Sequence, residues 1–124
     1  MKRFVALTLV LLSVLGVALT AAASTEGKLV IWADELRTTV VKDLAKEFTT
    51  KYKVPVEVQE LAFGDIRDQL AVAGPAGKGP DIIVGAHDWL GQLVTNGLIE
   101  PLDFAKQKDF SPVALNAFTW GKNL

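Results

Sequence analysis

The alternation of hydrophobic and polar residues changes period along the chain, and each period predicts a different element. Residues 28–33 (KLVIWA) form a nearly continuous apolar run rich in β-formers, which predicts a strand buried on both faces. Residues 36–52 instead place apolar side chains at helical spacing with charged ones between, which predicts an amphipathic helix. Its apolar positions are Val40, Val41, Leu44, Phe48 and Tyr52. Residues 54–58 alternate valine with polar residues and predict a strand, in which Pro55 belongs at the start or at an edge.

The pattern continues through the second half of the chain. Gly64 and Asp65 can open a second helix with Asp65 as its N-cap. The inner face of that helix would carry Ile66, Leu70 and Ala73. Residues 74–80 (GPAGKGP) have the composition of a loop, and residues 81–85 (DIIVG) predict a third buried strand.

Two more helices are expected after the third strand. The first is marked by Trp89, Leu90, Leu93 and Val94. Asn96 and Gly97 supply its C-terminal stop. The second begins at Ser111, with serine as N-cap and Pro112 at the first helical position.

Strands and helices therefore alternate in the order β-α-β-α-β-α. This order predicts an α/β fold with a mostly parallel sheet, helices on both faces and right-handed crossovers. Ligands in such sheets bind beyond the carboxyl ends of the strands, where the strand order reverses. The first and third strands commonly flank that crevice, so we expect a site at the ends of residues 28–33 and 81–85.

The chain begins with the three parts of a secretory signal peptide. Lys2 and Arg3 carry positive charge, residues 4–19 are uncharged and mostly apolar, and three alanines precede Ser24. The alternative is a membrane anchor, because a span needs roughly 20 residues. The small side chains before Ser24 favour cleavage, which would divide the chain into a signal peptide at 1–23 and a mature part at 24–124. No cysteine follows the apolar run, so a lipoprotein anchor is excluded.

Removing the signal peptide changes the balance of charge. The 101 residues that remain carry 14 acidic and 11 basic side chains, a net charge of −3. The absence of cysteine excludes a disulfide scaffold and a cysteine-ligated metal site. The acidic excess disfavours nucleic-acid binding. We therefore expect an exported, soluble protein with one modest core and without metal or cofactor.

The predicted crevice would be lined by two polar loops. One carries Asp34, Glu35 and Arg37, and the other carries Asp88 and Trp89. Carboxylates accept hydrogen bonds from hydroxyl groups and an indole covers a C–H face, so this combination can bind a sugar. Asp34 and Asp88 could equally cap the helices that follow them, and one residue can serve both purposes.

Other readings of these residues remain open. Two of the acids could form a glycosidase pair, although the sequence does not fix their separation and gives no sign of a raised pKa. His87 is the sole histidine, with no serine or cysteine elbow beside it, and is either a structural hydrogen-bonder or a ligand contact. Phe63 could be a hydrophobic staple or a wall of the binding site. Trp32 lies within a strand and is expected in the core.

Three stretches resemble bacterial maltose/maltodextrin-binding proteins, which are extracellular solute-binding proteins of ABC sugar importers. They are GKLVIW at residues 27–32, GPDIIVGAHD at residues 79–88 and NGLIEPL at residues 96–102. The resemblance implies a periplasmic protein, monomeric at full length, that binds an oligosaccharide and delivers it to permease subunits in the membrane. It also implies ligand contacts from Asp34, Glu35 and Arg37 and from Ala86, Asp88 and Trp89.

Two departures from the family pattern affect this expectation. Some members carry an aromatic residue where this chain has Gly85 and an arginine where it has Trp89, so the stacking surface and the charges are rearranged. Members are also three to four times longer and consist of two lobes that close over the sugar. Residues 24–124 would then be the beginning of the first lobe, and such a piece should bind sugar weakly or not at all. The alternatives are a binding protein for another oligosaccharide or a polyol, and a complete small secreted α/β domain that binds proteins.

Overall fold

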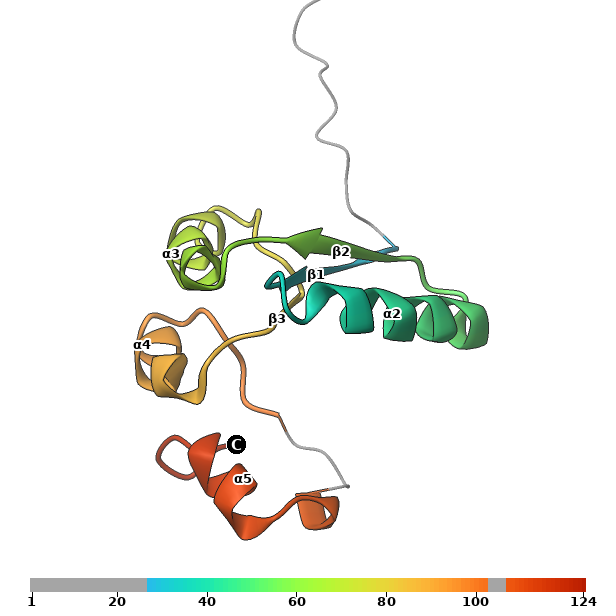
Figure 1. Ribbon diagram of the computed structural model, residues 1–124. Coiled ribbons are helices and arrows are strands. Elements are labelled where there is room, and N and C mark those ends of the chain that lie inside the picture. The colour runs from blue at the N-terminus through green and yellow to red at the C-terminus, as the bar shows by residue number, and fades with distance from the viewer. Residues whose placement is uncertain (1–26, 103–106) are drawn as a thin grey trace, which may run out of the picture.

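The centre of the structure is a three-stranded parallel sheet (Figure 1). The computed structural model describes residues 27–102 and 107–124, so the predicted signal peptide lies outside the described residues. The strands are β1 (Leu29–Ala33), β2 (Val56–Glu60) and β3 (Ile82–Ile83), in the order β2-β1-β3. Both pairings are parallel, with Leu29 opposite Val56 and Ile31 opposite Ile82. The expected parallel α/β sheet is therefore confirmed.

The third strand is shorter than the predicted residues 81–85. At its start the Asp81 carboxylate accepts the backbone N–H of Val30 at 2.8 Å, in the place where a strand carbonyl would otherwise accept it. The backbone N–H of Asp81 donates to the carbonyl of Val30 at 2.9 Å. Beyond the strand, Val84 N–H still donates to the Trp32 carbonyl at 2.9 Å. The contact with β1 thus extends over the predicted length, although only two residues have regular strand geometry.

Within residues 27–102 and 107–124, four helices and two short 3-10 turns connect and follow the strands. They are α2 (Thr38–Tyr52), α3 (Phe63–Ala73), η1 (His87–Trp89), α4 (Leu90–Thr95), η2 (Gln107–Asp109) and α5 (Pro112–Ala117). Figure 1 shows α2 alongside β1 and β2, with α3 and α4 beyond the ends to which the strands point and α5 next to α4. No helix in the described ranges has the length and apolar character needed to cross a bilayer.

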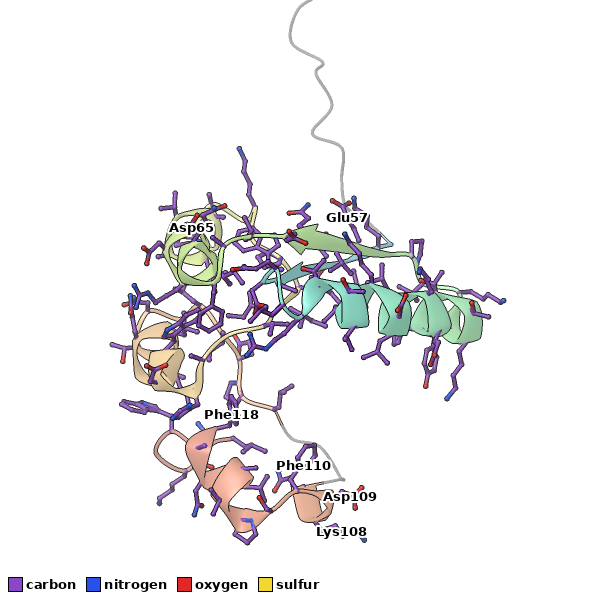
Figure 2. All side chains as sticks on the ribbon, viewed as in Figure 1. Glu57, Asp65, Lys108, Asp109, Phe110 and Phe118 are labelled. Carbon is purple, nitrogen blue, oxygen red and sulfur yellow. The ribbon has the colours of Figure 1, made fainter. Side chains whose placement is uncertain are left out.

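Three residues were predicted to cap or end a helix, and two of these three predictions are confirmed. Ser111 caps α5, where its hydroxyl accepts the Ala114 N–H at 3.3 Å. Gly97, with a φ of 63°, follows the end of α4 and donates its N–H to the Val94 carbonyl at 3.0 Å. The prediction that Asp65 is the N-cap of α3 is wrong. Ala62 holds that position without a side-chain hydrogen bond, and Asp65 is exposed in the first turn (Figure 2).

The hydrophobic core lies between one face of the sheet and the helices at the strand ends. Side chains alternate between the faces of a strand, so Val30 and Trp32 point to the same side. There they join a cluster of buried residues from α3, η1 and α4. The buried members are Trp32, Ile66, Leu70, Trp89 and Leu93. The predicted core positions of Trp32, Ile66 and Leu70 are therefore confirmed.

Helix α2 packs against β2 with its small side chains. Its buried residues are Thr38 and Ala45, which allow a close approach of the helix to the sheet. The apolar stripe that predicts an amphipathic helix is largely outside this contact, and Leu44 remains 59% exposed. Phe48 and Tyr52 pack on one another, with ring centroids 4.7 Å apart. The predicted helix is therefore present, but it packs on the sheet with its narrower, small-residue face and not with the apolar stripe.

Ile66 on α3 is buried whereas Leu44 on α2 is exposed, so substitutions at the two positions should affect stability differently. Ile66 is fully buried, so Ile66→Ala should lower the free energy of unfolding by about 2–5 kcal/mol through lost transfer energy and a cavity. Leu44→Gln on the exposed stripe should change it by about 0.5 kcal/mol or less. Urea unfolding followed by far-UV circular dichroism measures both. Equal losses for the two variants would contradict the placement of the core.

Candidate functional site

The order in which strands are added to the sheet reverses after β2. After β2 it crosses over β1 and adds β3 on the opposite side, so the switch point lies between β1 and β3. Leu61 N–H donates to the Ala33 carbonyl at 3.0 Å, which brings the segment after β2 next to the end of β1. The segments after all three strands therefore meet at one edge, where the sequence predicted a crevice.

Asp34 anchors the loop after β1. Its Oδ1 accepts the backbone N–H of Leu36 at 2.9 Å and that of Arg37 at 3.1 Å. Its Oδ2 receives the guanidinium of Arg37. The Asp34 carbonyl also accepts the Thr38 N–H at 2.8 Å, which leads the chain into α2. Both carboxylate oxygens are thus used within the loop.

The environment of Asp34 favours its ionised form. Burial opposes ionisation, but the Arg37 guanidinium and the two backbone N–H groups outweigh it and lower the pKa of Asp34. The residue is 1% exposed. The structure therefore does not support Asp34 as a ligand contact, and the alternative reading as a local cap describes its contacts. A carboxyl with a lowered pKa is also the opposite of the general acid that a glycosidase needs.

Two arginines and two aromatic rings form a layered stack across the three loops. The Arg37 guanidinium lies 5.6 Å from the centre of the Phe63 ring, and Phe63 lies 4.7 Å from Trp89. On α3, Arg67 lies 5.8 Å from the centre of the Trp89 ring. Each cation faces an aromatic ring, which stabilises the stack electrostatically. The stack fixes the loop after β1 against the start of α3 and the turn after β3.

Trp89 belongs to the core. It is 8% exposed and joins the buried cluster, so the expectation that its indole stacks on a ligand is not supported. Gly85 favours this position, because a Cβ on Gly85 would lie 3.0 Å from the Trp89 ring and the ring would have to shift by a few tenths of an ångström. The missing side chain at 85 leaves space that the indole at 89 fills. Phe63 and Ala86 are partly buried against the same cluster, and Phe63 thus braces the loops instead of forming an open wall.

Three of the predicted side chains remain available at this edge. Glu35, His87 and Asp88 are exposed, and among the described residues no hydrogen bond or ion pair engages them. His87 has an edge-on aromatic contact with Phe118, with centroids 6.4 Å apart. Arg37, two residues after Glu35, is half-exposed and has N–H groups beyond the one that it donates to Asp34. The edge therefore offers acceptors and donors from both loops, since Arg37 donates from the loop after β1 and the His87 ring carries an N–H after β3.

Residues 43–123 match the profile of a family described as bacterial extracellular solute-binding protein. The chain belongs to this family. It is 37% identical over 102 residues to the maltotriose-binding protein of Pyrococcus abyssi (strain GE5 / Orsay), covering 76% of this chain and 22% of the relative. It is 34% identical over 87 residues to the galactooligosaccharide-binding protein of Bacillus subtilis (strain 168), covering 69% and 21%.

Solved structures of this solute-binding family share the fold. A cyclo/maltodextrin-binding protein complexed with maltotetraose aligns with a TM-score of 0.73 and 37% identity, over 79% of this chain and 27% of that one. The Thermus thermophilus maltotriose binding protein bound with maltotriose aligns with a TM-score of 0.69 and 31% identity, over 78% and 28%. The expected resemblance is thus confirmed, and the chain spans about a fifth of the length of the curated relatives.

Arg67 has a role in this solute-binding protein that was not predicted from the sequence. Phe63 and Arg67 are four residues apart and so lie on one face of α3, which is the signal that could have been used. What the spacing could not show is that this face meets Trp89 from another part of the chain.

The ion pair of Asp34 predicts a pH-dependent contribution to stability. Asp34→Asn keeps an oxygen for the backbone N–H groups but removes the charge that holds Arg37, and should cost roughly 1 kcal/mol at pH 7. The pKa of Asp34 is lowered in the folded state, so its stabilisation is present above the ordinary value of 3.8 and is lost as the pH falls through the lowered value. The cost of the substitution should therefore shrink below about pH 3.8.

Urea unfolding at pH 7 and pH 3 measures this difference. Asp88→Asn is the matched control, because Asp88 is exposed and makes no ion pair among the described residues. Its effect should be small at both pH values. A cost for Asp34→Asn that is the same at pH 3 and pH 7 would show that the charge contributes nothing.

Proposed function

We propose that this chain forms part of the sugar-binding surface of an ABC importer's solute-binding protein, which delivers an oligosaccharide to the membrane permease. The proposal rests on two exposed carboxylates, Glu35 and Asp88, which lie at the switch point between β1 and β3 and make no hydrogen bond or ion pair with other described residues. They come from two loops that Asp34, Arg37 and the aromatic stack hold in place.

The chemistry of this edge suits a neutral, hydroxyl-rich ligand. Carboxylates accept hydrogen bonds from sugar hydroxyls, and the guanidinium of Arg37 donates to ring and hydroxyl oxygens. The relatives named for maltotriose and galactooligosaccharide binding support the same class. They differ in the sugar, so both α-glucans and galactooligosaccharides are candidates for this chain.

Binding without catalysis fits the electrostatics of the edge. Its one buried carboxyl, Asp34, has a lowered pKa and is held by Arg37, so it has no proton to give to a leaving group. The family is described as extracellular, and the predicted signal peptide supports export to the periplasm as a soluble protein without a lipid anchor.

A titration followed by two-dimensional 1H–15N NMR tests the proposal. Addition of maltotriose or a galactooligosaccharide should shift the backbone signals of Glu35, Arg37 and Asp88. One open face excludes little water, so we expect a dissociation constant near 1 mM, or about −4 kcal/mol, or weaker. Glu35→Gln should weaken the effect, because an amide accepts fewer hydrogen bonds than a carboxylate.

Two outcomes of the titration would contradict the proposal. If neither sugar moves these signals at tens of millimolar, while glycine or another amino acid does, the chain binds a different class of solute. A response confined to residues far from both loops would also contradict the proposed edge.

A further inference from the structure

The Arg37 side chain at the sheet edge has donors that the fold does not use. It is 54% exposed, and one of its nitrogens, Nη1, donates to the Asp34 carboxylate. Among the described residues no hydrogen bond engages its other side-chain N–H groups. A long exposed side chain loses rotamer freedom when it binds a ligand, and this loss weakens binding. The contacts that fix the guanidinium in advance therefore decide how well Arg37 can serve as a donor.

Asp34 holds one end of the guanidinium. The carboxylate is itself fixed, because it is 1% exposed and its Oδ1 accepts the backbone N–H groups of Leu36 and Arg37. Its Oδ2 accepts a hydrogen bond from Nη1 of Arg37. A contact at one nitrogen leaves the plane of the guanidinium free to turn about that bond. A second contact is needed to set the direction of the remaining N–H groups.

Phe63, at the start of α3, supplies the second contact. The Cζ atom of Arg37 lies 5.6 Å from the centre of the Phe63 ring, within the range of a cation–π interaction. The ring and the Asp34 carboxylate reach the guanidinium from different segments of the chain, α3 and the loop after β1. Together they limit both the position and the tilt of the guanidinium.

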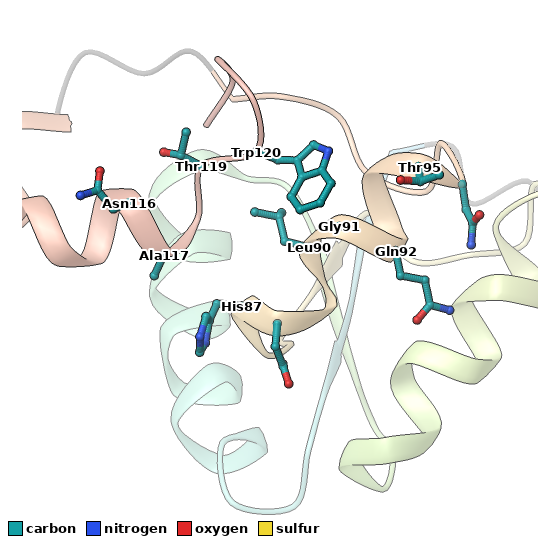
Figure 3. A pocket seen from close by; sticks show the side chains of 11 residues that line it. His87, Leu90, Gly91, Gln92, Thr95, Asn116, Ala117, Thr119 and Trp120 are labelled. Atoms are coloured by element: carbon teal, nitrogen blue, oxygen red, sulfur yellow. The ribbon is translucent and has the colours of Figure 1, made fainter.

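Phe63 is in turn supported by the core. Its ring centre lies 4.7 Å from that of Trp89, which is 8% exposed and belongs to the buried cluster. The neighbours of Trp89 in the chain, Asp88 and Leu90, instead line a hollow beside α4, where His87 also lies (Figure 3). Trp89 therefore points to the core side of its turn, and Phe63 packs on a ring that the core holds in place.

We propose that Phe63 is a positioning residue for the sugar-binding edge. With Asp34 it holds the Arg37 guanidinium in one orientation before a ligand arrives, so that the remaining N–H groups donate without a further loss of rotamer freedom. Phe63 acts through Arg37 and does not itself contact the sugar. The inference rests on the proposed function for its ligand, whereas the effect of Phe63 on Arg37 exists without any ligand.

The sugar-free protein gives the first test. Residues 24–124 contain two arginines, Arg37 and Arg67, so two arginine Nε–H signals are expected in 1H–15N NMR at mildly acidic pH. The heteronuclear NOE of the Arg37 Nε–H should be that of a restrained side chain, and Phe63→Leu should lower it. Phe63→Tyr keeps the ring and should preserve the NOE. The Arg67 Nε–H donates to Asp68 at 3.0 Å and serves as the internal reference.

A sugar titration gives the second test. The dissociation constant for maltotriose, measured from the backbone signals of Glu35 and Asp88, should rise about two- to fivefold in Phe63→Leu, as expected for loss of a cation–π contact at an exposed site. Phe63→Tyr should bind like the wild type. Phe48→Leu is the matched control, because it makes the same change in an aromatic pair on α2 and should leave the constant unchanged. An unmoved Trp32 indole signal shows that a variant retains the fold.

A double-mutant cycle separates positioning from direct contact. Arg37→Met removes the guanidinium and keeps the aliphatic stem. In that background Phe63→Leu should change the dissociation constant by less than about 1.5-fold, because the partner of the ring is gone. A residue that touched the sugar, or that only stabilised the fold, would cost the same affinity in both backgrounds.

Three results would overturn the proposal. They are an Arg37 NOE that Phe63→Leu leaves unchanged, a dissociation constant that Phe63→Leu leaves unchanged, and full additivity of Phe63→Leu with Arg37→Met. Failure of the proposed function gives a different result. Maltotriose would then shift none of the edge signals in the wild type, while the Arg37 NOE would still fall in Phe63→Leu. That result would support the hold of Phe63 on Arg37 and overturn the sugar as the ligand.

Discussion

Trp32 in the central strand bonds to the segments on both sides of it and packs in the core, and the rest of the structure depends on these contacts. Its indole N–H donates to Gln59 on β2 at 2.9 Å, which links the two long strands through their side chains as well as their backbones. Its carbonyl accepts the N–H of Val84, which ties down the end of β3. Its ring packs in the buried cluster with Ile66 and Trp89. One residue thus connects the sheet register, the core and the turn that carries Asp88.

The crowded core also decides which side chains are left for binding. Trp89 fills the space beside Gly85, so its indole is not available to a ligand. The Asp34 carboxylate is likewise unavailable, because it is bonded to Arg37. A carboxylate or an indole is useful to a ligand only when the fold does not already use it. By this criterion Glu35 and Asp88 are available at the sheet edge. The loops that carry the free groups are held against each other by the contacts among Arg37, Phe63, Trp89 and Arg67.

Some polar side chains at the sheet edge are already bonded within the fold and others are free to bind a ligand. This difference explains which parts of the site could be predicted from the sequence. The two loops were identified correctly as neighbours, because the order of strands and helices fixes where parallel strands end. The roles within each loop could not be separated, because Asp34 and Glu35 are adjacent acids and the sequence does not show which of them is buried. Burial depends on packing between segments that are distant in sequence.

The sequence by itself determined the order of the elements, the strand at residues 29–33, the capping of α5 by Ser111 and the end of α4 just before Asn96 and Gly97. These features follow from local periodicity and from backbone conformations that a few residue types favour. The tertiary structure alone decided that α2 turns Ala45 toward the sheet and leaves Leu44 exposed, and that Trp120 rests on Gly91. The physical reason is that a helical pattern marks several possible faces, whereas close packing between distant segments admits only the one whose side chains fit.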